Sequence, residues 1–157
     1  DILPFQRSLA LQCFTNEFIY EEMGIKITSI EVQHQPVEPA YGYQVFVDDK
    51  KITYSGDTRY SKNLEKASKN AEYLIHEVFV SLAFNEKRMT EDTLKNVKDY
   101  HSTPKDVGTL AKAANVKKLI LNHFVPPVFD EEILKAEISK YYKGEIIVGK
   151  DLDEFVL

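Results

Sequence analysis

Four histidines and one aspartate are the residues of this chain best suited to hold a metal ion or move a proton. Each histidine adjoins a segment with the apolar pattern of a strand or helix: His34, His76, His101 and His123. Asp57 follows a glycine at the end of another such segment. Imidazole nitrogens and carboxylate oxygens are common ligands of divalent metals, so these side chains could form a metal site if the fold brings them together.

Taken singly, each of these residues also has a structural interpretation. A lone histidine at a strand end more often satisfies a hydrogen bond of the protein than it binds metal. An aspartate after a glycine often caps its own turn. The shared position of His34, Asp57 and His123 at the ends of predicted strands favours a common divalent-metal site, although the sequence does not show that they converge.

Alternating and periodic apolar residues predict the elements that must position these groups. The predicted strands cover 25–34, which has the pattern of a strand or bulged strand, a hairpin over 43–47 and 51–55, then 72–75 and 117–121, with a final strand or hairpin after 142. The predicted helices cover 61–70, 103–114 and 130–142, with Ser61 and Thr103 as N-caps. The segment 79–100 gives no clear periodicity.

The alternation of strands and helices predicts one α/β domain. A chain of 157 residues with 43% hydrophobic residues can form one core but not two. No apolar run approaches the roughly 20 residues that a membrane span needs, so no membrane partner is expected. The single cysteine, Cys13, excludes an internal disulfide framework and is predicted to be a small buried apolar residue.

The charge of the chain bears on its substrate. A formal net charge of −5 argues against a broad basic surface for nucleic acid. Two bound divalent metals would add about four positive charges at one place and could still attract a phosphate or sulfate ester. Because the chain starts at Asp1 with no signal segment before it, we expect further residues upstream and a cytoplasmic location.

Five segments carry a resemblance to a known family. They are, in chain order, His34–Tyr43, Ser55–Arg59, Leu74–Glu77, His101–Thr103 and Leu119–Phe124. Together, over about residues 25–157, they resemble the C-terminal half of a metallo-β-lactamase-fold hydrolase, in the branch that contains ribonuclease Z, phosphodiesterases and arylsulfatase-like enzymes. The resemblance implies an αββα sandwich, of which residues 1–157 would form the C-terminal portion.

The same resemblance implies a role for each candidate residue around two divalent metal ions, first of all zinc, with manganese or iron as alternatives. His34 would bind the first metal, His123 the second, and Asp57 would bridge both through its two oxygens. His101 would assist catalysis outside the metal ligands, although it could instead support the start of a helix. His76 and Glu77 would orient the ligands by hydrogen bonding, the alternative being a buried ion pair or strand-end cap.

One part of the family pattern is absent from this sequence. The His-x-His-x-Asp-His segment, which supplies the other metal ligands, belongs to the N-terminal half of the family. We therefore expect the missing half, or a second copy of the chain, to cover an apolar sheet face that includes Ile30, Val32, Val45, Val47 and Leu119–Leu121. The alternative is a catalytically incomplete half-domain that serves as a structural or interaction module.

The substrate is predicted from what the sequence lacks. Members that process tRNA usually carry a long arm between the positions of His34 and Asp57, and this chain has room only for a hairpin there. Val78 and Phe79 also replace the Ala-Thr that usually follows the His-Glu pair in tRNA nucleases. These departures favour a small phosphate, sulfate or carboxylic ester, or a lactone. A ribonuclease Z-type endonuclease that acts on RNA is the alternative.

Overall fold

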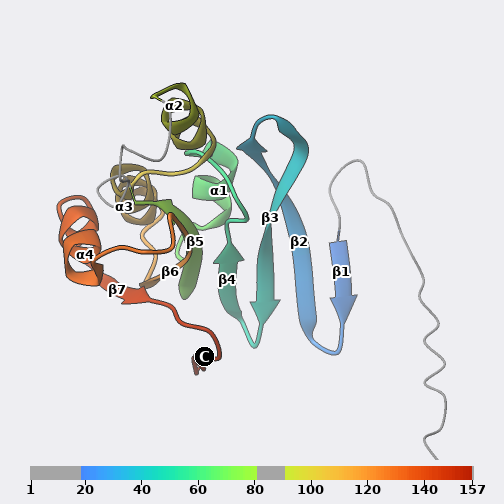
Figure 1. Ribbon diagram of the computed structural model, residues 1–157. Helices are drawn as coiled ribbons and strands as arrows, with labels where there is room; N and C mark the ends of the chain where they lie inside the picture. The colour runs from blue at the N-terminus through green and yellow to red at the C-terminus, as the bar shows by residue number, and fades with distance from the viewer. Residues whose placement is uncertain (1–18, 81–90, 157) are drawn as a thin grey trace, which may run out of the picture.

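The protein is described here by a computed structural model that covers residues 19–80 and 91–156, so Cys13 lies outside the described residues (Figure 1). Its strands form one seven-stranded sheet in chain order: β1 Ile19–Glu22, β2 Ile25–His34, β3 Val37–Val47, β4 Lys50–Tyr54, β5 Tyr73–Phe79, β6 Lys118–Val125 and β7 Glu145–Val148. The helices are α1 Lys62–Ala67, α2 Glu91–Tyr100, α3 Pro104–Ala113 and α4 Glu131–Ser139. The expected α/β class is confirmed.

Strand direction explains why the predicted site residues share one edge of the sheet. Strands β1 to β4 form an antiparallel meander, and β4 to β7 run parallel to one another. Two reversals separate β2 from β4, so β2 runs in the same direction as the parallel strands. The carboxyl ends of β2, β4, β5 and β6 therefore lie at one edge, which is where open α/β sheets place their sites.

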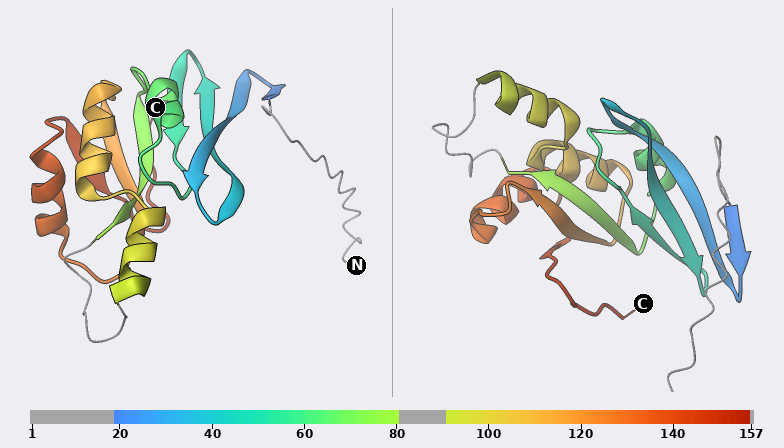
Figure 2. Two further views of the ribbon diagram at one scale, coloured as in Figure 1. Left: turned by 90° about the horizontal axis from the view of Figure 1, so that it is seen from above. Right: turned by 45° about the vertical axis from the view of Figure 1, so that its right-hand side comes forward.

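Helices α1, α3 and α4 pack on one face of the sheet and form the core with it (Figure 2). Parallel strands need crossover connections, and right-handed crossovers place their helices on the same side. Apolar side chains from α1, α3 and α4 meet those of the central strands: Leu64, Val107, Leu110, Leu134 and Ile138 against Leu74, Val78, Leu119 and Leu121. This arrangement is one sheet with its helix layer, which is half of an αββα sandwich.

The predicted helix starts are confirmed by their caps. The Ser61 hydroxyl accepts a hydrogen bond from the Leu64 amide, and Thr103 forms a capping box with Asp106. Helix α1 nevertheless ends at Ala67, before the predicted 70, because Asn70 has a left-handed backbone with φ of 56°. Helix α4 likewise ends at Ser139 instead of 142.

Three strands extend further than predicted, and the first, β3, begins at Val37 instead of 43. Strand β5 continues to Phe79, so His76 and Glu77 lie within a strand and not after it. Strand β6 continues to Val125 and contains His123. Strand β1 was not predicted, since all four of its residues are exposed and carry no burial pattern. Helix α2 lies in the segment that periodicity left unassigned.

The β3–β4 hairpin fills the whole interval in which an arm would stand. Its turn is made by Asp48 and Asp49, both with positive φ, as tight hairpins require. No helix in the described part of the chain is long and apolar enough to cross a membrane. The cytoplasmic location remains a prediction.

The second face of the sheet lies opposite the helices shown in Figure 2. Residues paired across strands point to the same face, and the register groups apolar side chains there: Tyr43, Val45, Ile52, Tyr54, Ile75, Ile120 and Ile147. We call this set the open face. Most of these residues are half-buried, Tyr54 is exposed and Ile120 is buried.

The open face differs from the one predicted. Ile30, Val32, Leu119 and Leu121 were expected to lack a cover, and instead they belong to the core. The error has a physical reason, because both faces of the central strands are apolar and the sequence does not show which face the helices occupy. Val45 belongs to the open face and Val47 lies beside it on the same strand, and both are half-buried.

Candidate metal centre

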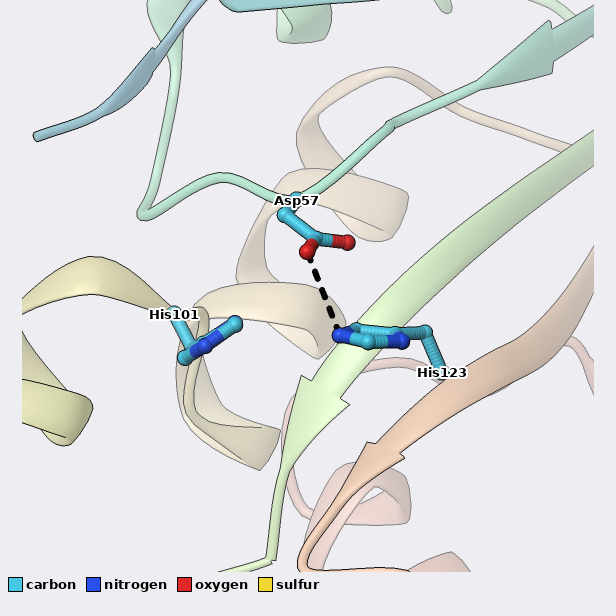
Figure 3. Close-up of side chains that lie close together, drawn as sticks. All are labelled: Asp57, His101 and His123. Carbon is cyan, nitrogen blue, oxygen red and sulfur yellow. Dashed lines mark ion pairs between the residues drawn. The ribbon is translucent and has the colours of Figure 1, made fainter. Parts of the chain in front are cut away.

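Three predicted site residues converge at the carboxyl edge of the sheet (Figure 3). Asp57 follows β4, His101 follows α2, and His123 projects from β6. Each offers one ligand atom, and these atoms all lie within 4.8 Å of one another. The closest recorded pair is His123 Nε2 and Asp57 Oδ2, at 3.2 Å.

Backbone shape places Asp57 in this group. Gly56 has a φ of 58°, and a Cβ atom there would lie 2.5 Å from the Tyr41 carbonyl oxygen, so only glycine fits. The Ser55 amide donates to the Ile75 carbonyl at 2.9 Å, and the Glu77 amide donates to the Ser55 hydroxyl at 3.0 Å. These contacts fasten the loop that begins at Ser55 to strand β5.

His123 is placed by a bulge in β6. Glu77 pairs with Asn122 and Val78 pairs with Phe124, so His123 is the extra residue between them. Its φ is 40°, in the left-handed region that few non-glycine residues adopt. Bulges next to sites redirect a side chain, and here the imidazole reaches Asp57.

Glu77 joins the loops that carry Asp57 and His101. Its carboxylate is 1% exposed, and Oε1 accepts hydrogen bonds from the amides of Thr58 at 3.1 Å and Ser102 at 3.0 Å. The same oxygen lies 3.3 Å from His101 Nδ1, an ion-pair distance. The Glu77 side chain on β5 thus holds both loops by hydrogen bonds to their backbone amides.

The charge state of His101 reflects two opposing effects. Burial of the ring lowers its pKa, but the adjacent Glu77 carboxylate, with a contribution from Asp57, raises it by more. The pKa of His101 therefore lies above the ordinary histidine value. A histidine in this setting can carry a proton near neutral pH, as a proton donor to a leaving group requires.

His34 lies beside this group but is not one of the three residues within it. Its ring is 5.2 Å from that of His101, measured between centroids. Its Nδ1 is 3.0 Å from the Tyr100 carbonyl, which can only accept, so Nδ1 carries the proton and Nε2 remains the possible metal ligand. Its role as a ligand remains a prediction.

His76 is not brought to the site. Alternation along β5 places it with Leu74 and Val78 on the helix-covered face, fully buried. Its Nδ1 donates to the Glu77 carbonyl at 2.7 Å, and its Nε2 has no hydrogen-bond partner among the described residues. Burial lowers the pKa of His76, which keeps the ring neutral in the folded chain.

We expect His76 to make the chain sensitive to acid. Above the ordinary pKa of 6.5 the ring is neutral in both states, but below it the unfolded chain takes up a proton that the folded chain does not. The free energy of unfolding should then fall by up to about 1.4 kcal/mol per pH unit from this group. His76→Asn keeps the donor to the Glu77 carbonyl and cannot titrate.

Urea unfolding of both proteins between pH 7.5 and 5 measures this effect. The variant should show a shallower loss of stability below pH 6.5, even if it is less stable throughout. Equal slopes in the two proteins would contradict a neutral buried His76.

The donors at this edge fit a divalent metal. Two imidazoles and a carboxylate are the chemistry of zinc sites. Ligands held about 2.1 Å from a tetrahedral metal lie roughly 3.4 Å apart, which is close to the 3.2 Å between His123 Nε2 and Asp57 Oδ2. His101 was predicted to act outside the metal ligands, and the structure places its donor atom in the same group.

Three residues that hold the site were not predicted from the sequence. They are Thr58, Tyr100 and Ser102, and each adjoins a predicted site residue. The Thr58 amide donates to Glu77, and the Tyr100 carbonyl contacts His34. The Ser102 hydroxyl donates to the Thr58 carbonyl at 2.7 Å. The only available signal was their place beside Asp57 and His101, and only Thr58 and Ser102 lie within the five segments of the family resemblance. Such contacts depend on backbone atoms that a sequence does not place.

Comparison with known proteins identifies relatives of this chain. Residues 12–124 match the family described as the β-lactamase superfamily domain. Ribonuclease Z of Mycobacterium bovis is 27% identical over 135 residues, covering 85% of this chain and 48% of that protein. The chain thus spans about half the length of the curated relatives it matches.

Solved structures agree on the fold. The metallo-β-lactamase fold protein YhfI from Bacillus subtilis superposes with a TM-score of 0.69 at 22% identity, covering 85% of this chain and 50% of that one. The short form of human tRNase Z gives a TM-score of 0.57 at 23% identity, covering 88% and 44%.

Proposed function

Because this chain belongs to the β-lactamase superfamily and is a metallo-β-lactamase-fold hydrolase of the ribonuclease Z-like kind, we propose that its carboxyl edge forms half of a dinuclear metal centre. The observation that carries the proposal is the convergence of two proposed ligands, Asp57 and His123, with the His101 ring beside them. Two divalent metals, with zinc as the first candidate, would supply an activated water and polarise the ester oxygen.

The residues of this chain would have distinct roles in binding the metals and in catalysis. Asp57 would hold both metals through its two oxygens, while His34 and His123 would each hold one. His101, held 3.3 Å from the Glu77 carboxylate, would hydrogen-bond or protonate the leaving oxygen. Glu77 would keep His101 oriented and favour its protonated form.

The proposed substrate is a small ester, with a phosphodiester first and sulfate esters, carboxylic esters or lactones after it. The tight β3–β4 hairpin supplies no arm to grip a large RNA. A chain with a net charge of −5 has no excess of Lys and Arg to make additional contacts with RNA phosphates.

A ribonuclease Z-type role is the second candidate, and the relatives favour it. The alignment with the Mycobacterium bovis ribonuclease Z spans 135 residues and 85% of this chain, which leaves little room for an inserted arm in that relative either. The missing arm therefore argues less strongly against an RNA substrate than the sequence alone suggests.

Parallel assays separate the two candidates. We expect the zinc- or manganese-loaded protein, with any N-terminal half present, to hydrolyse bis(p-nitrophenyl) phosphate faster than it trims a precursor tRNA at its 3′ end. p-Nitrophenyl sulfate and a lactone complete the small-ester series, and chelator-treated protein is the control. Efficient, salt-sensitive tRNA cleavage with negligible small-ester turnover would instead support the ribonuclease candidate.

The open face supports a proposal about a partner. Its apolar side chains are those that a second sheet would bury in an αββα sandwich. We propose that the N-terminal half of the same domain covers it, with a second copy of this chain as the alternative. An inactive interaction module would also use this face, but it would bind no metal.

A further inference from the structure

Thr58 contacts three neighbouring segments of the candidate site. Its amide donates to Glu77 Oε1 at 3.1 Å, and its carbonyl accepts from the Ser102 hydroxyl at 2.7 Å. Its own hydroxyl accepts from the Gln33 amide at 3.1 Å. The residue is fully buried, directly after Asp57 in the chain.

The contact with Gln33 fills a gap in the sheet. The register between β2 and β3 shifts between Val32 and His34, and Gln33 has no paired residue there. The Gln33 carbonyl accepts from the Arg59 amide at 2.9 Å and lies 3.2 Å from the Thr58 hydroxyl. Residues 58 and 59 thus satisfy the backbone groups that precede His34.

We propose that the Thr58 hydroxyl is a positioning group that sets His34 relative to Asp57. One hydroxyl, attached to the residue after Asp57, binds the residue before His34. The proposal rests on the proposed metal centre, because the two side chains must reach it from different strands. Thr58 itself touches no substrate or metal.

The Thr58 hydroxyl also lies 2.7 Å from the Arg59 carbonyl, but the contacts that hold the loop to Glu77 and Ser102 do not involve it. Glu77 and Ser102 hold Thr58 through its backbone amide and carbonyl, and a side-chain substitution keeps both contacts. Thr58→Val has the same shape as threonine but no hydroxyl. It should therefore release the His34 side of the site and leave Asp57 in place.

The experiment compares Thr58→Val with Thr58→Ser and Thr53→Val. Thr58→Ser keeps the hydroxyl. Thr53 is also fully buried, lies on β4 before the same loop, and its hydroxyl has no partner among the described residues. Thr53→Val is thus a matched loss of a buried hydroxyl away from the site.

Zinc affinity, measured by competition with a chromophoric chelator well below the unfolding temperature, is the main readout. We expect Thr58→Val to bind zinc about 10- to 100-fold more weakly, the range in which losing an outer hydrogen bond weakens a metal site. Thr58→Ser and Thr53→Val should bind as the unchanged protein does. Native affinity in Thr58→Val, or equal losses in Thr58→Val and Thr58→Ser, would overturn the proposal.

Amide hydrogen exchange of Gln33 in the metal-free protein gives a second readout. Exchange should accelerate in Thr58→Val and remain slow in Thr58→Ser and Thr53→Val. If the unchanged protein binds no zinc with its N-terminal half present, the proposed metal centre fails, whereas unchanged Gln33 exchange in Thr58→Val would refute the positioning contact itself. The two failures are therefore distinguishable.

Discussion

In the complete enzyme, with the N-terminal half present, Asp57→Ala is expected to abolish tight binding of both metal ions and, with it, hydrolysis. A carboxylate that bridges two metals serves each of them, so its removal leaves both sites short of a ligand. The loss should exceed the about 100-fold that follows from removing an outer hydrogen-bond partner of a ligand. Elemental analysis and calorimetric titration with zinc measure stoichiometry and affinity directly.

Asp151→Ala is the matched control for Asp57→Ala, because Asp151 is an exposed aspartate in the turn after β7. It should keep both metals and full turnover. Circular dichroism checks that both variants fold. Loss of a single metal in Asp57→Ala would make Asp57 a terminal ligand, and retention of both metals would remove it from the centre.

The open face leads to the second large effect. Leaving even about 400 Å² of apolar surface exposed would cost on the order of 10 kcal/mol at roughly 25 cal/mol per Å², which is comparable with the whole stability of a domain. We therefore expect the isolated chain to associate with itself and bind a hydrophobic dye. Adding the N-terminal half should suppress both effects in light scattering and fluorescence.

Two valines provide a matched test of that face. Val45→Asp places a charge within the open face and should prevent association with the N-terminal half. Val128→Asp changes an exposed valine in the loop after β6 and should have no effect. A stable, monodisperse monomer of 18.1 kDa that binds no dye and carries no second polypeptide would show that the chain closes its core alone.

Much of the fold could be predicted from local signals. Ser61 and Thr103 mark helix starts by side-chain chemistry, and alternation over 25–34 identifies β2 with its end at His34. Strand ends were harder to predict, because Val78 and Phe124 extend their ladders by pairing with each other across strands. Pairing depends on a neighbour that is distant in sequence.

The candidate site was predictable in its residue types but not in its geometry. The quoted motifs contain Asp57, His101 and His123, and the structure brings all three together. The position of His101 within the donor group depends on Glu77, which holds the loop from a different strand. Similarly, no periodic pattern could show that His76 points toward the helices while its neighbour faces the site.

The bulge at His123 lowers the stability of the fold but places a side chain that the candidate site needs. A left-handed backbone at a non-glycine residue costs of order 1 kcal/mol or more, and the φ of 40° at this position carries that cost permanently. Glycine would relieve it and would also remove the imidazole that reaches Asp57. Directed evolution for thermal stability alone would therefore tend to discard this candidate ligand, whereas its retention would indicate selection for activity.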